Sequence, residues 1–338
     1  MVALAQQVLS HALHSNTRSS YNSAVAHIHK FHQRLNIPFS LPVSADTLCL
    51  WMADSADKLR YPSIRAYLHG IATLQTELGY PNPIQQSPLV WRMFKAIKRL
   101  QGQTVARKRL PITVNILHQL DSHIDITNPS HLCMRAAMWL GTCGLLRAGE
   151  FTSKHHGQTP PLLQHLQFYD KSSFIIEFKR LSSVVRHYMS LNLLASKTDT
   201  FRAGTTVIIS HPRAIQHMVQ YLLTRPLHLS RLPLLVGDDG QPLSTATLVR
   251  FTQSLIEKAH IPNSHLFLGH SFRKGGATSL HEAGNPDSLI KTMGRWNSFA
   301  FATYIETSLT TLIKAGLSMM KADKPAHDLP DSFWEAMD

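Results

Sequence analysis

Residues 268–305 read LGHSFRKGGATSLHEAGNPDSLIKTMGRWNSFAFATYI, and the rest of the chain can be organised around this stretch. It opens with His270 and Arg273 and ends with Trp296 and Tyr304. The paired N–H groups of an arginine suit the non-bridging oxygens of a phosphate. A histidine and an indole can each donate one more hydrogen bond, and a phenol can act as a nucleophile. This order of residue types indicates phosphoryl transfer to a tyrosine.

Length and charge define the broad class of the protein. With 338 residues the chain is long enough for two domains, each with its own hydrophobic core. A formal net charge of +13 favours a phosphate-rich partner, and no lipidation motif or basic amphipathic terminus favours an anionic membrane instead. No apolar run is long enough to span a bilayer, and the first residues do not form a convincing signal peptide. The three cysteines and 21 histidines lack the spacing of a disulfide framework or metal site, so we expect no metal and no cofactor.

The first hundred residues predict a domain of four helices, because apolar residues recur at helical spacing in four segments separated by prolines and glycines. The last segment has a basic face formed by Arg92, Lys95, Lys98 and Arg99. The segment that follows, QGQTVARKRLP over 101–111, is polar and favours a domain boundary. It adds Arg107, Lys108 and Arg109. A basic helix face alone is typical of a solvated surface. Because the basic residues continue into the next segment, contact with phosphate is favoured here.

The remainder of the chain predicts helices around a small β-sheet. Helices are expected from about Thr113, over 131–140, over 211–223 and after Ser244. Residues 165–180 and 189–210 each contain β-branched and aromatic runs around a polar turn, the pattern of a β-hairpin. The expected fold class is therefore mainly α with a small β-sheet (α+β), with an all-helical N-terminal domain and a mixed second domain.

A further arginine follows a glycine-rich turn in the segment GTCGLLRAGEF, residues 141–151. Glu150 lies one helical turn after Arg147, where its carboxylate can fix the guanidinium by a charged hydrogen bond.

These motifs, in this order, resemble the tyrosine recombinases of the phage-integrase type. HSFRKGGAT and GRWNSFAFATY look most like the recombinases of Crypton and DIRS-like mobile elements. LLRAGEF resembles the first catalytic-arginine motif of that family, and SKTD-x-F-R-x-G resembles the turn that carries its lysine. The resemblance implies a helical core-binding (SAM-like) domain at 1–103, a linker at 104–111, a catalytic domain at 112–322 and a tail at 323–338.

The resemblance also implies a role for each candidate residue. The implied catalytic set is Arg147, Lys197, His270, Arg273, Trp296 and the nucleophile Tyr304, with Glu150 as structural support. Lys179, which also lies near a predicted strand end, is a rival for the role of Lys197. The family often has histidine where this chain has Trp296, and an indole cannot act as a general base. Taken alone, His270 is as often structural as catalytic, and Trp296 and Tyr304 are more often core residues. Arg147 and Arg273 would usually be surface charges, so the prediction depends on the joint pattern.

The implied activity is site-specific DNA recombination or integration for a mobile element. Tyr304 would attack the scissile phosphorus and Lys197 would protonate the departing 5′-oxygen. A 3′-phosphotyrosyl bond would then form without ATP or metal. The implied partners are double-stranded DNA and further copies of the chain, as a tetramer in the synapse, with no membrane and no small-molecule substrate. The implied location is the nucleus in a eukaryote, or otherwise with DNA in the cytoplasm.

Two other functions use the same residues. A type IB topoisomerase would relax one duplex without joining two, and a domesticated DNA-binding protein would bind without cleaving. An apolar run after Tyr304, residues 309–320, could dock on a neighbouring protomer or on its own domain.

Overall fold

The computed structural model describes residues 15–102, 109–153, 160–194, 204–225, 232–237, 240–305, 307, 312–313 and 317. These residues belong to two compact units that divide between residues 106 and 107. The first unit is all-helical, and the second combines helices with one four-stranded sheet. The predicted α+β fold class is confirmed. No described helix has both the length and the apolar character needed to cross a bilayer.

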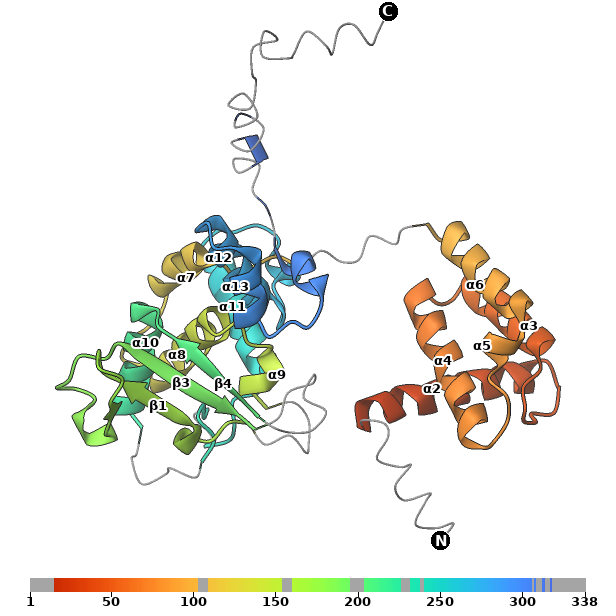
Figure 1. Ribbon diagram of the computed structural model, residues 1–338, viewed down its shortest axis with the longest axis horizontal. Coiled ribbons are helices and arrows are strands. Elements are labelled where there is room, and N and C mark those ends of the chain that lie inside the picture. Colours follow the sequence, from red (N-terminus) through yellow and green to blue (C-terminus); the bar gives the residue numbers. More distant parts are fainter. Residues whose placement is uncertain are drawn as a thin grey trace, which may run out of the picture. The chain divides into compact units, whose positions relative to one another are not determined.

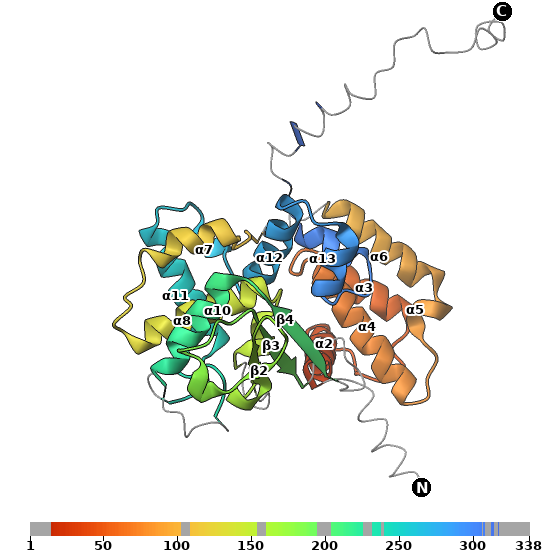
Figure 2. The same cartoon turned by 60° about the vertical axis from the view of Figure 1, so that its left-hand side comes forward.

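The first unit is a helical domain whose elements are seen in Figure 2. Its helices are α2 (Ser15–Arg34), α3 (Ala45–Ala56), α4 (Tyr61–Glu77), α5 (Pro83–Gln86) and α6 (Pro88–Leu100). Ser44 accepts a hydrogen bond from the Thr47 amide and so begins α3, as its sequence predicts. Helix α5 was not predicted: Asn82 caps a single helical turn within a proline-rich segment that otherwise resembles a loop.

The second unit is larger and contains the remaining elements. In chain order these are α7 (Val114–Asp121), α8 (Pro129–Cys143), α9 (Ala148–Phe151), η1 (Leu163–His165), β1 (Leu166–Tyr169), β2 (Ile175–Ile176), η2 (Phe178–Arg180), β3 (Tyr188–Leu193), β4 (Thr205–Ile209), α10 (Pro212–Leu223), α11 (Thr245–Lys258), η3 (Ser264–Leu266), α12 (Ser271–Glu282), α13 (Asp287–Met293) and η4 (Phe299–Tyr304). Helices α7 and α11 begin where they were predicted, and Thr113 and Ser244 are their N-caps. Helix α8 extends three residues beyond its expected end.

The sheet consists of the two predicted hairpins placed side by side. Its strand order is β2-β1-β3-β4 and every pairing is antiparallel. Figure 1 shows β1, β3 and β4 side by side. Phe168 on β1 lies opposite Ile176 on one side and Met189 on the other. These three side chains are buried, because residues that face each other across an antiparallel ladder project to the same side of the sheet.

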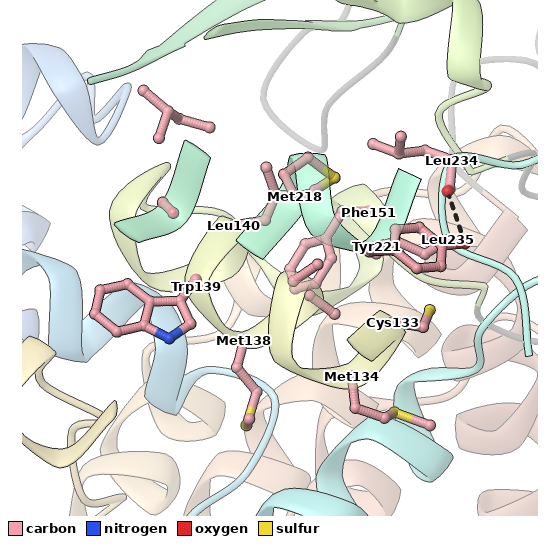
Figure 3. Packing of buried hydrophobic residues seen from close by; sticks show 14 of the residues in the cluster. Cys133, Met134, Met138, Trp139, Leu140, Phe151, Met218, Tyr221, Leu234 and Leu235 are labelled. Atoms are coloured by element: carbon pink, nitrogen blue, oxygen red, sulfur yellow. Dashed lines mark hydrogen bonds between the residues drawn. The ribbon is translucent and has the colours of Figure 1, made fainter. Parts of the chain in front are cut away.

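Helix α8 lies at the centre of the second core. Its residues from Leu132 to Thr142 are all buried, which is typical of a helix covered on every side. Figure 3 shows Met134, Met138 and Leu140 among the side chains of this core. Tyr221 of α10 donates its hydroxyl to the Leu234 carbonyl at 3.2 Å, so its polar atom is satisfied inside the core. This packing fixes the end of α8, where the candidate site begins.

The glycine pair of α12 lets this helix approach the backbone of two other segments. A Cβ atom on Gly275 would lie 1.7 Å from the Ile112 carbonyl oxygen, and one on Gly276 would lie 2.1 Å from the Thr142 carbonyl oxygen. Neither oxygen belongs to a flexible side chain, so the main chain itself would have to move. The close approach places Arg273, on the same helix, next to the end of α8.

Gly275→Ala is therefore expected to destabilise the second unit by more than about 3 kcal/mol, because the added methyl group overlaps main-chain atoms. Urea denaturation followed by circular dichroism measures this change. Gly284→Ala is the matched control: its φ of 79° is strained for alanine, but nothing lies within 4 Å of the added atom. It should cost about 1–2 kcal/mol. An equal cost for both variants would contradict the close contact at Gly275.

Candidate active site

The turn between α8 and α9 places Arg147. Gly144 closes α8, and Leu145 takes a left-handed conformation with φ of 47°, which is uncommon for a residue with a side chain. Both Leu145 and Leu146 are buried, so the turn is anchored to the core. Arg147 then occupies the N-cap position of α9, with its side chain 18% exposed.

Glu150 holds this arginine from one turn further along. Its Oε1 accepts a hydrogen bond from Arg147 Nη1 at 2.7 Å, and its Oε2 accepts one from the Arg147 backbone amide at 2.9 Å. The Glu150 side chain is only 6% exposed, and in such surroundings a charge-assisted hydrogen bond is stronger than on the surface. The pair fixes the direction of the Arg147 guanidinium.

Arg273 lies on the first turns of α12 and is completely buried. Its Nη1 donates to the Leu145 carbonyl at 2.8 Å, and its Nη2 donates to the Gly294 carbonyl. Burial, together with the positive charge of Arg147, lowers the pKa of Arg273 to about 10, although Glu150 acts in the opposite direction. The side chain stays protonated at neutral pH and forms a buried cation.

Two aromatic rings cover the Arg273 guanidinium. Its Cζ lies 4.3 Å from the centroid of the Trp296 ring and 5.7 Å from that of Tyr304. The two rings contact each other, with centroids 5.1 Å apart. Trp296 thus presents a ring face to Arg273, an arrangement stabilised by cation–π attraction. The sequence had suggested an indole that donates a hydrogen bond to phosphate, and packing against an arginine is a different contact.

A small hydrophobic cluster sets the position of Tyr304. Trp296 and Phe301 are buried in it together with Leu145, Ala277 and Ile290. A Cβ atom on Gly294 would lie 1.6 Å from Trp296 Cζ3, so only glycine admits the indole here. The half-buried Tyr304 ends η4, and its carbonyl accepts a hydrogen bond from Thr278 of α12 at 3.3 Å. The candidate nucleophile therefore lies beside Arg273 of its own chain.

A third arginine in this site was not predicted. Arg295 Nη2 donates to Glu150 Oε2 at 2.9 Å, so one carboxylate contacts both Arg147 and Arg295. The same carboxylate lies 4.0 Å from Arg273 Nη1. Sequence reasoning passed over Arg295 because it stands next to Trp296, the residue that carries the resemblance. A charged residue between a glycine and a tryptophan in GRW was the only local signal.

Three guanidinium groups thus surround a single carboxylate, and two positive charges remain uncompensated within the group. The Nε atoms of Arg273 and Arg295 are buried and have no hydrogen-bond partner among the described residues. A buried donor without an acceptor is unfavourable, and an anionic ligand could supply the missing oxygens. The described residues contain no group of histidine, cysteine or acidic side chains that could hold a metal ion. The arrangement is suited to a phosphate.

The other predicted residues lie as follows. His270 is half-buried at the N-cap of α12, three residues before Arg273. Lys197, Arg107 and Lys108 lie outside the described residues, and Lys179 is exposed in η2. The basic residues of α6, together with Arg109, are exposed. Most of the tail after Tyr304 also lies outside the described residues.

Known proteins share this architecture. No family model matches the chain. The chain is 26% identical over 257 residues to an integrase/recombinase xerD homolog of Selenomonas ruminantium, a match that covers 71% of this chain and 66% of that protein. The chain therefore spans slightly less than two thirds of that relative's length.

Solved structures show the likeness of fold. The XerH site-specific recombinase bound to palindromic difH substrate aligns with a TM-score of 0.60 at 14% identity, over 90% of this chain and 79% of that one. The chain has the tyrosine-recombinase fold. The Tn1549 transposon integrase in complex with transposon right end DNA aligns with a TM-score of 0.57 at 13% identity, over 94% and 98% of the two chains. Within this tyrosine-recombinase fold, the cationic group around Glu150 and the neighbouring Tyr304 form the candidate active site.

Proposed function

We propose that the protein is a site-specific DNA recombinase or integrase that cuts and rejoins DNA through a 3′-phosphotyrosyl bond. The observation that carries this proposal is the position of Tyr304, whose ring lies 5.7 Å from the Arg273 guanidinium in a site with two uncompensated positive charges. A phenol next to buried cations is suited to attack a phosphodiester. The fold and the relative described above support the same activity.

The chemistry follows from the charges in the site. The Tyr304 oxygen attacks the scissile phosphorus, and the bond to the 5′-oxygen of the leaving strand breaks. Arg147 and Arg273 stabilise the charge that grows on the non-bridging oxygens. His270 donates a hydrogen bond to the same oxygens and helps to take up the proton that the Tyr304 phenol loses, and Lys197 protonates the departing 5′-oxygen. The 3′-phosphotyrosyl ester conserves the energy of the cleaved bond, so the reverse step joins a new 5′-hydroxyl without ATP.

Access to the site requires a movement. Arg273 is fully buried and covered by Trp296 and Tyr304, so a DNA phosphate reaches its guanidinium only when these rings shift. Because Tyr304 lies beside Arg273 of its own chain, attack within the same protomer needs a short displacement of η4. We propose that DNA binding supplies this displacement and that cleavage occurs in cis.

We propose double-stranded DNA and further copies of this chain as partners, with a tetramer holding two duplexes. The Crypton-like and DIRS-like motifs favour a mobile element as the source of the chain and its termini as the target. The location would be the nucleus in a eukaryote and the DNA-containing cytoplasm otherwise. No step of this mechanism uses a metal ion.

A nicked suicide duplex tests the activity. Cleavage releases a short fragment that carries the 5′-hydroxyl, and its loss prevents religation and traps the protein on DNA. Incubation without divalent metal, followed by denaturing electrophoresis, should show a covalent adduct. Recombinant joints from two duplexes would distinguish a recombinase from a topoisomerase, which would only relax supercoils. Binding without any adduct would instead support a DNA-binding protein that has lost catalysis.

The basic face of α6 gives a separate prediction for DNA affinity. The residues concerned are Arg92, Lys95, Lys98 and Arg99. Each that contacts a phosphate should contribute about 0.9 to the slope of log binding constant against log salt, so its change to glutamine lowers that slope by about 1. Binding titrations at several salt concentrations measure this slope. Lys58→Gln is the control, because this exposed lysine of the same unit already pairs with Asp54 at 2.8 Å. An unchanged slope for all four variants would remove α6 from the DNA interface.

A further inference from the structure

We infer that Arg295 is a positioning residue of the proposed recombinase site: it occupies Glu150 Oε2 and thereby holds Arg147 and Arg273 where a phosphate can use them. This inference rests on the proposed function and adds a residue that the sequence motifs did not indicate. The evidence for this role consists of the hydrogen bonds of Arg295, the distance between Glu150 and Arg273, and the backbone conformation at position 295.

The Arg295 side chain links three segments of the second unit. Its Nη2 donates to Glu150 Oε2 at 2.9 Å and lies 3.4 Å from the Leu145 carbonyl oxygen. Its Nη1 lies 3.3 Å from the Gly144 carbonyl oxygen and 3.4 Å from that of Met293. The guanidinium therefore connects the end of α8, the start of α9 and the end of α13. Arg147 lies between the first two of these segments, and the third leads to Trp296 and Tyr304.

Arg295 also determines which cation Glu150 binds. Glu150 Oε1 is occupied by Arg147, and Oε2 accepts from Arg295 and from the Arg147 backbone amide. Arg273 Nη1 stays 4.0 Å from Oε2 and donates to the Leu145 carbonyl instead. Without Arg295, the Arg273 guanidinium, only 4.0 Å away, could pair with Oε2. A direct Glu150–Arg273 pair would draw that guanidinium away from an incoming phosphate.

The net positive charge of the site also supports a positioning role for Arg295. Arg295 is 14% exposed, and burial lowers its pKa from the ordinary value, although Glu150 raises it. Neutralising Glu150 alone would require one arginine, and three are present. A third buried cation is unfavourable unless an anion enters the site, since each charge has lost its water. A phosphodiester whose non-bridging oxygens gain charge during attack is such an anion.

The backbone at Arg295 allows a clean test. Its φ is 57°, in the left-handed region where glycine is the favoured residue. Arg295→Gly therefore relaxes the backbone and removes the guanidinium in one change. A contribution of Arg295 to stability through the backbone would appear as a gain in this variant. A positioning role would appear as a loss of cleavage in a folded protein.

The experiment measures the initial rate of adduct formation on the nicked suicide duplex, with the full chain in saturating excess. The variants are Arg295→Gly, Arg295→Lys, Glu150→Gln and the double variant Arg295→Gly/Glu150→Gln. Asn263→Gly is the control for backbone relief, because Asn263 also has a left-handed φ of 63° and an exposed side chain. Melting temperature and DNA affinity are measured in parallel.

We expect Arg295→Gly to lower the rate of adduct formation by about 10- to 100-fold, the range typical of residues that orient the groups of an active site. DNA affinity should be unchanged. Arg295→Lys should recover part of the rate, because it restores a cation near Glu150. The double variant should lose no more than the worse single variant, since both changes break the same contact. Asn263→Gly should react at the wild-type rate.

Several outcomes would overturn the inference. A wild-type rate in Arg295→Gly, or losses that multiply in the double variant, would show that Arg295 does not act through Glu150. If Arg295→Gly does not fold, Arg295→Lys decides, and a wild-type rate there would count against the role. If the wild-type protein forms no adduct while binding DNA, the proposed function fails and the role of Arg295 fails with it.

Discussion

Tyr304→Phe should form no covalent adduct with a nicked suicide duplex, a loss of about 10³-fold or more. The substitution removes the one oxygen proposed to attack phosphorus. It keeps the ring that packs 5.1 Å from Trp296 and that covers Arg273, so the site should retain its shape. Melting temperature and DNA affinity should therefore stay close to the wild-type values. Denaturing electrophoresis of the trapped complex measures the adduct.

Tyr188→Phe is the matched control for this experiment. Tyr188 lies on β3, stacked on Tyr169 with ring centroids 4.5 Å apart, and belongs to the sheet. It should form adduct at the wild-type rate. If Tyr304→Phe formed adduct as fast as the control, the nucleophile would be another residue and the proposed mechanism would be wrong.

Arg273→Ala should abolish adduct formation and also destabilise the second unit. A transition-state donor of this kind contributes about 10²–10³-fold to the rate. Removing the side chain leaves the Leu145 and Gly294 carbonyls without this donor and opens a cavity under Trp296. The free energy of unfolding should fall by about 2–5 kcal/mol. The loss of stability is expected because Arg273 is completely buried.

Arg273→Lys separates the two effects. It keeps a positive charge and most of the buried volume, but one ammonium group cannot reproduce the planar set of donors that meets both carbonyls. Stability should recover more than cleavage does. Both quantities are measured below the unfolding transition of each variant, by urea titration and by adduct formation at saturating protein. A fully active Arg273→Ala protein would remove Arg273 from the catalytic set.

Helix and strand positions were largely readable from local sequence. The helix starts at Thr113 and Ser244 and the two hairpins depend on side chains a few residues apart, and the structure has them where they were predicted. The exception was α5, where prolines typical of a loop sit at the start of a helical turn. The motifs around Arg147, Arg273 and Tyr304 likewise pointed to one site, because the order of residue types limits the chemistry they can share.

The partners within that site were decided by tertiary structure. The hydrogen bond from Arg273 to the Leu145 carbonyl joins residues 128 positions apart, and that from Arg295 to Glu150 joins residues 145 positions apart. No local pattern encodes such contacts, since they depend on how closely α12 approaches the end of α8. The approach is possible because Gly275 and Gly276 carry no side chain. Short sequence motifs thus determined which residue types are available to bind a phosphate. The packing of distant helices determined that Arg295 pairs with Glu150 and that Arg273 lies under Trp296.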